Sequence, residues 1–233
     1  ADVRSSAARA LGNQSTLSEA AIHSLIGALK DEDEDVGYSA ADALDNQSTL
    51  SEATIHSLIG LLNHEDASVR WRAGQVLANQ STLSEAAIQS LIGALNDENA
   101  HARSSAAEAL GFHSPLSESA IQSLIGALKD EDEDVGDRAA EALGYQSTLS
   151  ESAIHSLIGA LKDEDADVRQ RAAEALGKQS TLSEAAIQSF IGALNDEDAN
   201  VRRGAADVLG NQSTLSEAAI QSLIGALKDE DAD

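Results

Sequence analysis

The chain has 233 residues and a formal net charge of −25, with no Cys, no Met and one Pro. A charge this negative argues against nucleic-acid binding, because contacts to phosphate require a cationic surface. No apolar run approaches the roughly 18 residues of a membrane-spanning helix, and without Cys there is no disulfide framework. We expect a soluble protein that does not enter membranes. Its compartment stays open, with the cytoplasm slightly favoured.

The whole sequence is built from a repeat of 33 residues, of which residues 166–198 are a good example. They read ADVRQRAAEALGKQSTLSEAAIQSFIGALNDED, and similar copies stand on both sides without insertions or deletions. The seven copies begin at Ala1, Glu34, Ala67, Ala100, Glu133, Ala166 and Ala199. Self-similarity at this period is typical of solenoids, in which each unit packs against its neighbours. The sequence therefore predicts a single array over residues 1–233.

The first predicted helix of each copy, here called the B helix, is amphipathic. In residues 166–177 the apolar side chains recur at helical spacing and predict a buried stripe. The stripe consists of Val168, Ala172, Ala175 and Leu176. Asp165 and Asp167 suit the helix N-terminus, where free N–H groups favour carboxylates. Gly177 follows the stripe and is expected to stop the helix.

A polar linker, KQSTL in this copy, leads to the second predicted helix, here called the A helix. Ser183 is the expected N-cap, with Thr181 as the alternative. The predicted buried stripe of this helix consists of Ile187, Phe190, Ile191 and Leu194. Gly192 lies in mid-helix, where Gly costs about 1 kcal/mol relative to Ala. Either duplication copied it, or a neighbouring helix passes too close for a methyl group.

One pair of helices cannot bury both apolar stripes by itself, so neighbouring copies must cover them. We therefore predict an all-α fold. It is a right-handed α-solenoid of seven two-helix units, with about 14 helices.

The run DADVRQRAAEALG, followed by AAIQSFIGALNDED, resembles HEAT-like repeats of the phycobilisome-lyase type. The motifs V-R, A-A, A-L-G and A-L-x-D recur in register over the whole chain, although the linker NQSTLS is longer than usual. The resemblance implies that the B helices line a concave face. It also implies a ladder between units, in which a turn Asp pairs with an Arg six residues later. The pairs that fit are Asp97 and Arg103, Asp163 and Arg169, and Asp196 and Arg202.

Three positions interrupt this ladder. Gly37 and Gly136 replace the Arg, and His64 replaces the Asp before Arg70. We expect the junctions at these positions to be looser than the others.

The copies differ mainly at their fifth, sixth, ninth and thirteenth positions, which lie on or just past the B helix and off its buried stripe. Four of the five aromatic residues fall there: Tyr38, Trp71, Phe112 and Tyr145. Aromatic side chains that cannot fill the core are typical of interface anchors. Neutral drift is the alternative, but drift would also have altered the exposed sites of the A helix. The expected partner-binding residues are Tyr38, Asp42, Trp71, Arg72, Gln75, Glu108, Phe112, Arg138, Glu141 and Tyr145.

Charge at the 28 variable positions is balanced, with six cationic and six anionic side chains. The surplus of negative charge lies in the turns and at helix starts, where it supports capping and solubility. The expected partner is therefore a protein or peptide with an apolar centre and mixed charges around it.

Neither catalysis nor a cofactor is indicated by any motif. His23, His56 and His155 share one exposed A-helix position, but successive copies are about 10 Å apart, too far to share a metal ion. The acidic spacing of residues 130–141 is like that of a calcium loop, but Gly is missing at the sixth place and a B helix follows. The sequence predicts no catalytic, cofactor or metal site.

The two ends carry unpaired apolar stripes, on the first B helix and on the last A helix. Either the chain was cut from a longer array, or copies associate head to tail. The main functional hypothesis is a non-enzymatic scaffold that binds a protein or peptide along a groove lined by the B helices. The alternatives are the sensor or assembly region of a larger signalling protein, a subunit of a bilin-lyase-like enzyme, and a designed array.

Overall fold

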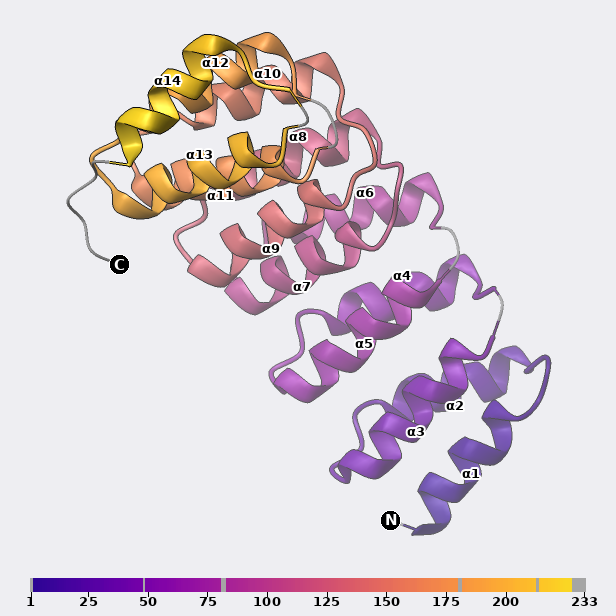
Figure 1. Cartoon of the computed structure of the whole chain (residues 1–233). Helices are drawn as coiled ribbons and strands as arrows, with labels where there is room; N and C mark the ends of the chain where they lie inside the picture. Colours follow the sequence, from indigo (N-terminus) through magenta and orange to yellow (C-terminus); the bar gives the residue numbers. More distant parts are fainter. Residues whose placement is uncertain (1, 48, 81–82, 180–181, 213, 228–233) are drawn as a thin grey trace. The chain divides into compact units, whose positions relative to one another are not determined.

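The computed structural model describes residues 2–47, 49–80, 83–179, 182–212 and 214–227, which form fourteen α-helices and no β-strand (Figure 1). The helices are α1 (Asp2–Gly12), α2 (Glu19–Ala28), α3 (Glu34–Asp45), α4 (Glu52–Leu61), α5 (Ala67–Asn79), α6 (Glu85–Ala94), α7 (Ala100–Gly111), α8 (Glu118–Ala127), α9 (Glu133–Gly144), α10 (Glu151–Ala160), α11 (Ala166–Gly177), α12 (Glu184–Ala193), α13 (Ala199–Gly210) and α14 (Glu217–Ala226). The odd-numbered helices are the B helices and the even-numbered ones the A helices, so the predicted all-α repeat is confirmed.

Two compact units make up the chain, residues 1–113 and 114–233. The division falls in the linker of the fourth copy, where FHSPLS stands in place of NQSTLS. In the first unit α1, α3, α5 and α7 pack side by side as one layer, and α2, α4 and α6 form a second layer (Figure 1). In the second unit α9, α11 and α13 form the B layer, and α8, α10, α12 and α14 form the A layer. A single array over 1–233 stays a prediction.

Each A helix packs against the B helix that follows it in sequence. The pairs are α2 with α3, α4 with α5, α6 with α7, α8 with α9, α10 with α11 and α12 with α13. The short acidic turn therefore joins the two helices of a packed pair, and the longer polar linker leads from one pair to the next.

Side-chain caps fix where the helices begin. Ser183 Oγ accepts a hydrogen bond from the Ala186 N–H at 3.2 Å, which confirms the predicted cap of α12. All seven A helices have such a cap: Ser18, Ser51, Ser84, Ser117, Ser150, Ser183 and Ser216. Thr181 lies outside the described residues. Asp165 caps α11 by accepting from the Asp167 N–H at 2.9 Å, as its place in the sequence predicts.

The predicted core stripe of α11 is buried in full, and that of α12 only in part. Phe190 and Leu194 of the second stripe are buried, whereas Ile187 and Ile191 are half-buried. Ala186 and Ala193 are buried instead. Small residues lie on the covered face because α12 packs against α13 and also between α10 and α14.

The structure decides two expectations about glycine. Helix α11 ends at Gly177, as predicted, but not through a left-handed conformation, because no described glycine has a positive φ. Gly177 permits close packing, since a Cβ there would lie 2.5 Å from Val208 Cγ2 on α13. At Gly192 a Cβ would meet nothing within 4 Å, so the alternative of a closely passing helix is excluded and copying by duplication is the one that is left. The same holds at Gly27, Gly60, Gly93, Gly126, Gly159 and Gly225.

Glutamine side chains tie the linkers of successive copies together. In the first unit, Gln47 Oε1 accepts from the Leu17 N–H at 3.0 Å and its Nε2 donates to the Gln14 carbonyl at 3.2 Å. In the second unit, Gln146 accepts from the Leu116 N–H at 3.0 Å, and Gln179 donates to the Gln146 carbonyl at 3.3 Å. These buried amides satisfy linker backbone groups that no helix reaches. The long linker thus has a structural use.

Candidate interaction surface

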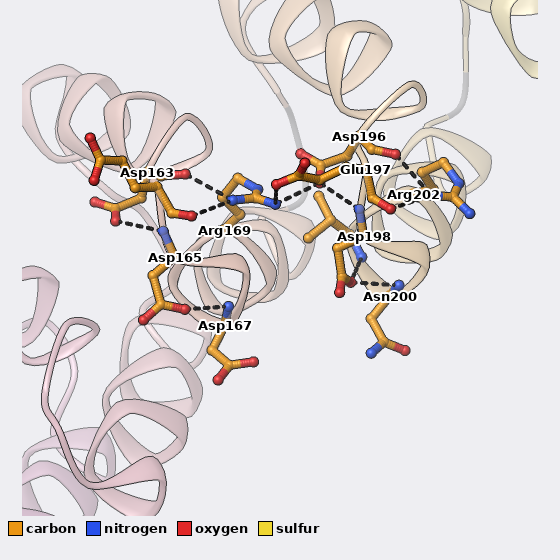
Figure 2. A network of polar contacts seen from close by, with 11 residues as sticks. Asp163, Asp165, Asp167, Arg169, Asp196, Glu197, Asp198, Asn200 and Arg202 are labelled. Atoms are coloured by element: carbon orange, nitrogen blue, oxygen red, sulfur yellow. Dashed lines mark hydrogen bonds and ion pairs between the residues drawn. The ribbon is translucent and has the colours of Figure 1, made fainter.

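Arginine side chains join the turns that precede the B helices. Arg169, the fourth residue of its copy, donates from Nη1 to the carbonyls of Asp163 and Glu164, at 2.9 and 3.0 Å (Figure 2). Its Nη2 donates to Asp196 Oδ1, in the following turn, between α12 and α13, at 2.7 Å. One guanidinium therefore joins two successive turns.

This arrangement corrects the predicted ladder. The Arg contacts the backbone carbonyl of the Asp six residues earlier, and the carboxylate that it binds belongs to the next turn. Arg4 follows the same rule, because its Nε and Nη2 contact the Asp31 carboxylate at 2.9 and 3.0 Å. Arg70 donates to the carbonyls of His64 and Glu65 at 2.7 and 2.8 Å. A carbonyl accepts equally well from any residue type, so His64 fits where other copies have Asp.

The expected looser junction at Gly37 is also wrong. Five other copies have Arg at this position, and here Arg72 of the next copy fills the space. A Cβ on Gly37 would overlap the guanidinium of Arg72. Arg72 is 1% exposed, and its Nη1 donates to the Leu29 carbonyl at 2.7 Å. Gly37 therefore makes room for a buried guanidinium.

Gly136 and Arg171 repeat this exchange in the second unit, where a Cβ on Gly136 would lie 2.5 Å from Arg171 Cζ. Arg171 donates to the carbonyls of Leu128 and Glu133, at 3.3 and 3.2 Å. Lys129 binds the Asp163 carboxylate, which is the role of the missing Arg, and this contact holds the pKa of Asp163 below its ordinary value. This junction is likewise filled.

Tyr38 and Trp71 form an exposed aromatic pair on the adjacent helices α3 and α5. Their ring centroids are 5.6 Å apart with an interplanar angle of 71°, an edge-to-face contact. The side chains are 42% and 50% exposed. Arg72 Cζ lies 5.0 Å from the Tyr38 centroid, so the buried cation supports the ring from within the fold. Arg72 is a predicted partner-binding residue, but its burial limits it to this indirect role.

The other predicted residues of the first unit lie along the same layer of B helices. Asp42 is exposed one turn after Tyr38, Gln75 and Glu108 are half-buried, and Phe112 is exposed at the end of α7. Because α3, α5 and α7 pack side by side, these side chains belong to one face. Phe112 lies at the opposite helix end from the Tyr38–Trp71 pair.

In the second unit the predicted residues gather on α9. Arg138 Nη1 contacts Glu141 Oε2 at 3.0 Å, and both side chains are exposed. Tyr145 follows the helix and is 57% exposed, with Lys178 Nζ 5.2 Å from its ring centroid. This aromatic ring stands alone beside a mixture of charges, whereas the first unit has a pair.

Other kinds of site find little support. His23, His56 and His155 are exposed, as predicted. Within the ranges that the structure describes, no three His, Asp or Glu side chains gather in a way that suits a metal ion. None of the described helices is long and apolar enough to cross a membrane. An open cavity of about 650 Å³ lies beside α10 and α12, but its lining is a mixture of both charges, Lys162 and Arg169 against Asp163, Asp196 and Glu197.

Stacked helix pairs linked through their turns define the class of the protein, an α-solenoid repeat protein. The family model described as HEAT repeats matches residues 1–78, 55–144, 121–190 and 154–233, which together span the sequence. The chain belongs to the HEAT repeat family. This is a family of repeat scaffolds, and no catalytic family is indicated by the match.

One solved structure supports the fold, and two others are similar to the chain at lower TM-scores. The X-ray structure of YibA from Escherichia coli is 22% identical, with 92% of this chain and 83% of that chain covered and a TM-score of 0.54. An engineered protein is 24% identical over 97% of this chain and 68% of that one, with a TM-score of 0.46. A designed armadillo repeat protein in complex with the peptide (KR)4 is 18% identical over 83% and 99%, also with a TM-score of 0.46. No curated protein matches the sequence.

Proposed function

We propose that the chain is a non-enzymatic scaffold that binds a protein or peptide along the exposed face of its B helices. The observation that carries this proposal is the placement of the aromatic residues. The four at variable positions are 42% to 57% exposed, whereas Phe190, which replaces a core Leu, is fully buried. Large exposed aromatic side chains are the usual anchors of protein interfaces.

The support beneath the aromatic residues favours recognition over drift. Drift on a free surface produces isolated side chains, but Tyr38 contacts Trp71 edge-to-face and lies over a buried Arg72. A ring held on two sides loses little conformational entropy when a partner covers it. The pair is therefore prepared for binding before a partner arrives.

Charges around the anchors indicate the kind of partner. Asp42 and Glu108 lie on the aromatic face of the first unit, and Arg138 with Glu141 lies beside Tyr145 in the second. Both signs lie beside Tyr145, where Lys178 is also close, whereas the two charged side chains named on the first unit are anionic. We expect a segment that places apolar side chains on the rings and carries both charges beside them.

The test replaces Trp71, Phe112 and Tyr145 together with Ala. Proteins captured by the wild type from an extract are compared with those captured by the triple variant, and a protein lost with the variant is purified for calorimetric titration. We expect its affinity to fall at least about tenfold, because each interface anchor contributes about 2 kcal/mol. Circular dichroism should show unchanged helicity, because the three side chains are exposed. An unchanged affinity would refute the proposal.

A matched control changes three exposed side chains on the A helices: His23, His56 and His155, each to Ala. This variant alters the same number of side chains on the other layer, so binding should persist. Loss of binding in both variants would place the partner elsewhere or indicate a general defect in the array.

The resemblance to phycobilisome-lyase repeats suggests a second candidate, a subunit of a bilin-lyase-like enzyme. Titration of the chain with a free bilin, followed by visible absorbance, separates the two candidates. A saturable spectral change would favour the lyase. The same scaffold function also suits a sensor or assembly region of a larger signalling protein and a designed array.

A further inference from the structure

Helix α1 exposes a valine that is buried in the other copies. Val3 is 83% exposed, whereas Val36, Val69, Val135, Val168 and Val201 and the equivalent Ala102 are at most 3% exposed. All belong to B helices, and in the later copies the preceding A helix covers them. Helix α1 has no such partner within the described residues.

Helix α14 has the complementary feature. Leu227, directly after it, is 85% exposed, whereas its six equivalents are at most 5% exposed: Leu29, Leu62, Leu95, Leu128, Leu161 and Leu194. Ile220 and Ile224 are also exposed. Together with Ala206 of α13, these residues line an apolar cavity of about 360 Å³. In earlier copies the following B helix occupies the equivalent place.

We propose that two copies of the chain associate head to tail, with α1 of one copy packed on α13 and α14 of another. The occupant is specified by the molecule itself. Six internal junctions show an A helix packed against the next B helix, and α3 packed against α1 shows how successive B helices meet. Helix α1 carries the residues that those junctions bury, Val3, Ala7, Ala10 and Leu11, at the same repeat positions as Val36, Ala40, Ala43 and Leu44.

The end of α13 fits this geometry as well. A Cβ on Gly12 would lie 2.9 Å from Ala43 Cα of the next copy, so close backbone approach is part of the junction. Gly210 is the equivalent of Gly12, and a Cβ there meets nothing within 4 Å. In the proposed contact, Ala10 of the second molecule takes the place of Ala43. Gly210 is then needed for the contact between molecules and not for the fold.

A contact between two different surfaces leaves one free end on each side of a pair, so further copies can add and produce open chains or rings. The high negative charge opposes association, because like-charged molecules repel, and salt screens this repulsion. The weight-average mass should therefore rise with protein concentration and rise further with added salt.

The test is light scattering and sedimentation velocity on the full chain without an expression tag, over a concentration series. We expect the average mass to pass that of a dimer at the highest concentrations. A monomer at every concentration, in low and high salt, would overturn the proposal.

Two single variants decide which surfaces meet. Val3→Glu blocks the first end and Ile224→Glu blocks the second, and both side chains are exposed, so each variant should fold with unchanged helicity. Each alone should be monomeric, but an equimolar mixture should form a heterodimer through the remaining intact ends. Self-association of Val3→Glu alone would indicate contact between two α14 helices, and self-association of Ile224→Glu alone would indicate contact between two α1 helices. Either result contradicts the head-to-tail contact.

Gly210→Leu is a third variant, which places a side chain where Ala10 should approach. It should abolish oligomers without lowering the melting temperature, since the site is open within one chain. The triple aromatic variant should still associate. The two proposals can therefore fail separately.

Discussion

The junction between α3 and α5 and the junction between α9 and α11 share a Gly–Arg pair. They differ in the side chain that covers the buried Arg. Both have Gly at the fourth position of one copy and a buried Arg at the sixth position of the next. Above Arg72 lies the ring of Tyr38, at 5.0 Å from centroid to Cζ. Above Arg171 lies the carboxylate of Asp137, with its Oδ1 2.8 Å from Nε. A guanidinium interacts favourably with an aromatic ring or with a carboxylate. The exposed residue can therefore change while the buried Arg stays.

The exposed residue at the fifth position can vary independently of the buried Arg below it. Tyr38 and Asp137 occupy the same repeat position and present opposite chemistry to a partner, aromatic in one unit and anionic in the other. Neither replacement disturbs the Arg, because its bonds to main-chain carbonyls remain. Variation at the fifth position therefore costs the fold little.

The largest expected loss of stability comes from replacing the buried Arg. Arg72→Ala should destabilise the first unit by about 3 kcal/mol, because it opens a cavity and removes a charged donor from a buried carbonyl. Arg171→Ala should cost the second unit a similar amount, about 3 kcal/mol, because it removes a donor from two carbonyls, while the pairing with the exposed Asp137 adds little. Urea unfolding of each variant measures both values. Arg138→Ala is the control, since this Arg occupies the same repeat position but is exposed.

The effects of substitutions at Gly37 and Arg72 on stability should not be additive. Gly37→Arg introduces a side chain into occupied space, and Arg72→Ser empties that space, so each alone should destabilise by about 2 kcal/mol. Together they recreate the pattern of the third and fourth copies, Arg70 followed by Ser105. The double variant should regain more than 1 kcal/mol relative to the sum of the single changes, as measured by a double-mutant cycle in urea. Additive losses of stability would mean that Gly37 and Arg72 are not energetically coupled.

Lowering the pH should destabilise the first unit through its linker histidine, which the linkers of the second unit do not have. His113 takes the place of the linker glutamine in the first unit, where its ring bonds the Leu77 carbonyl and burial lowers its pKa below 6.5. As the pH falls below 6.5, the unfolded chain binds a proton before the folded chain does, so stability is lost. His113→Gln removes this loss. The stability gained by the variant, from urea unfolding, should therefore be larger at pH 5.5 than at pH 7.5, and a constant difference would contradict the assignment.

The smallest change in stability should come from replacing a mid-helix Gly with Ala, and it should be the same in both units. Gly93→Ala in the first unit and Gly126→Ala in the second should each raise stability by about 0.5–1 kcal/mol, because Ala favours the helix and its methyl group meets nothing within 4 Å. Thermal denaturation checks the sign. A matched loss should follow Gly177→Ala, whose Cβ would meet Val208.

The sequence predicted the features that depend on local rules. Helical spacing located the α11 stripe, and the capping preference of Ser located the start of α12, since both depend on residues close together in the chain. The aromatic residues were also correctly expected to lie off the core. Their role in binding stays a prediction, because it depends on a molecule outside this chain.

Features that depend on contact between copies were missed. Arg72 and Arg171 have the sequence context of surface residues, and only their pairing with a Gly in the preceding copy marked them as buried. The linker Gln is present in six of the seven copies and was not recognised as a bond between linkers. Gly177 ends a helix and Gly192 lies in mid-helix, and only the position of the neighbouring helix shows that the first is closely packed and the second is not.

The bonds of Arg169 also bear on how such a chain can change in length. Arg169 donates to carbonyls in the turn just before its own helix and also to a carboxylate in the following turn, 33 residues further along the repeat. An inserted copy with the common Arg brings one bond of each kind and leaves no old bond broken. Recombination between copies can thus add or remove whole units, and move an exposed aromatic residue along the array, without the evolution of a new junction.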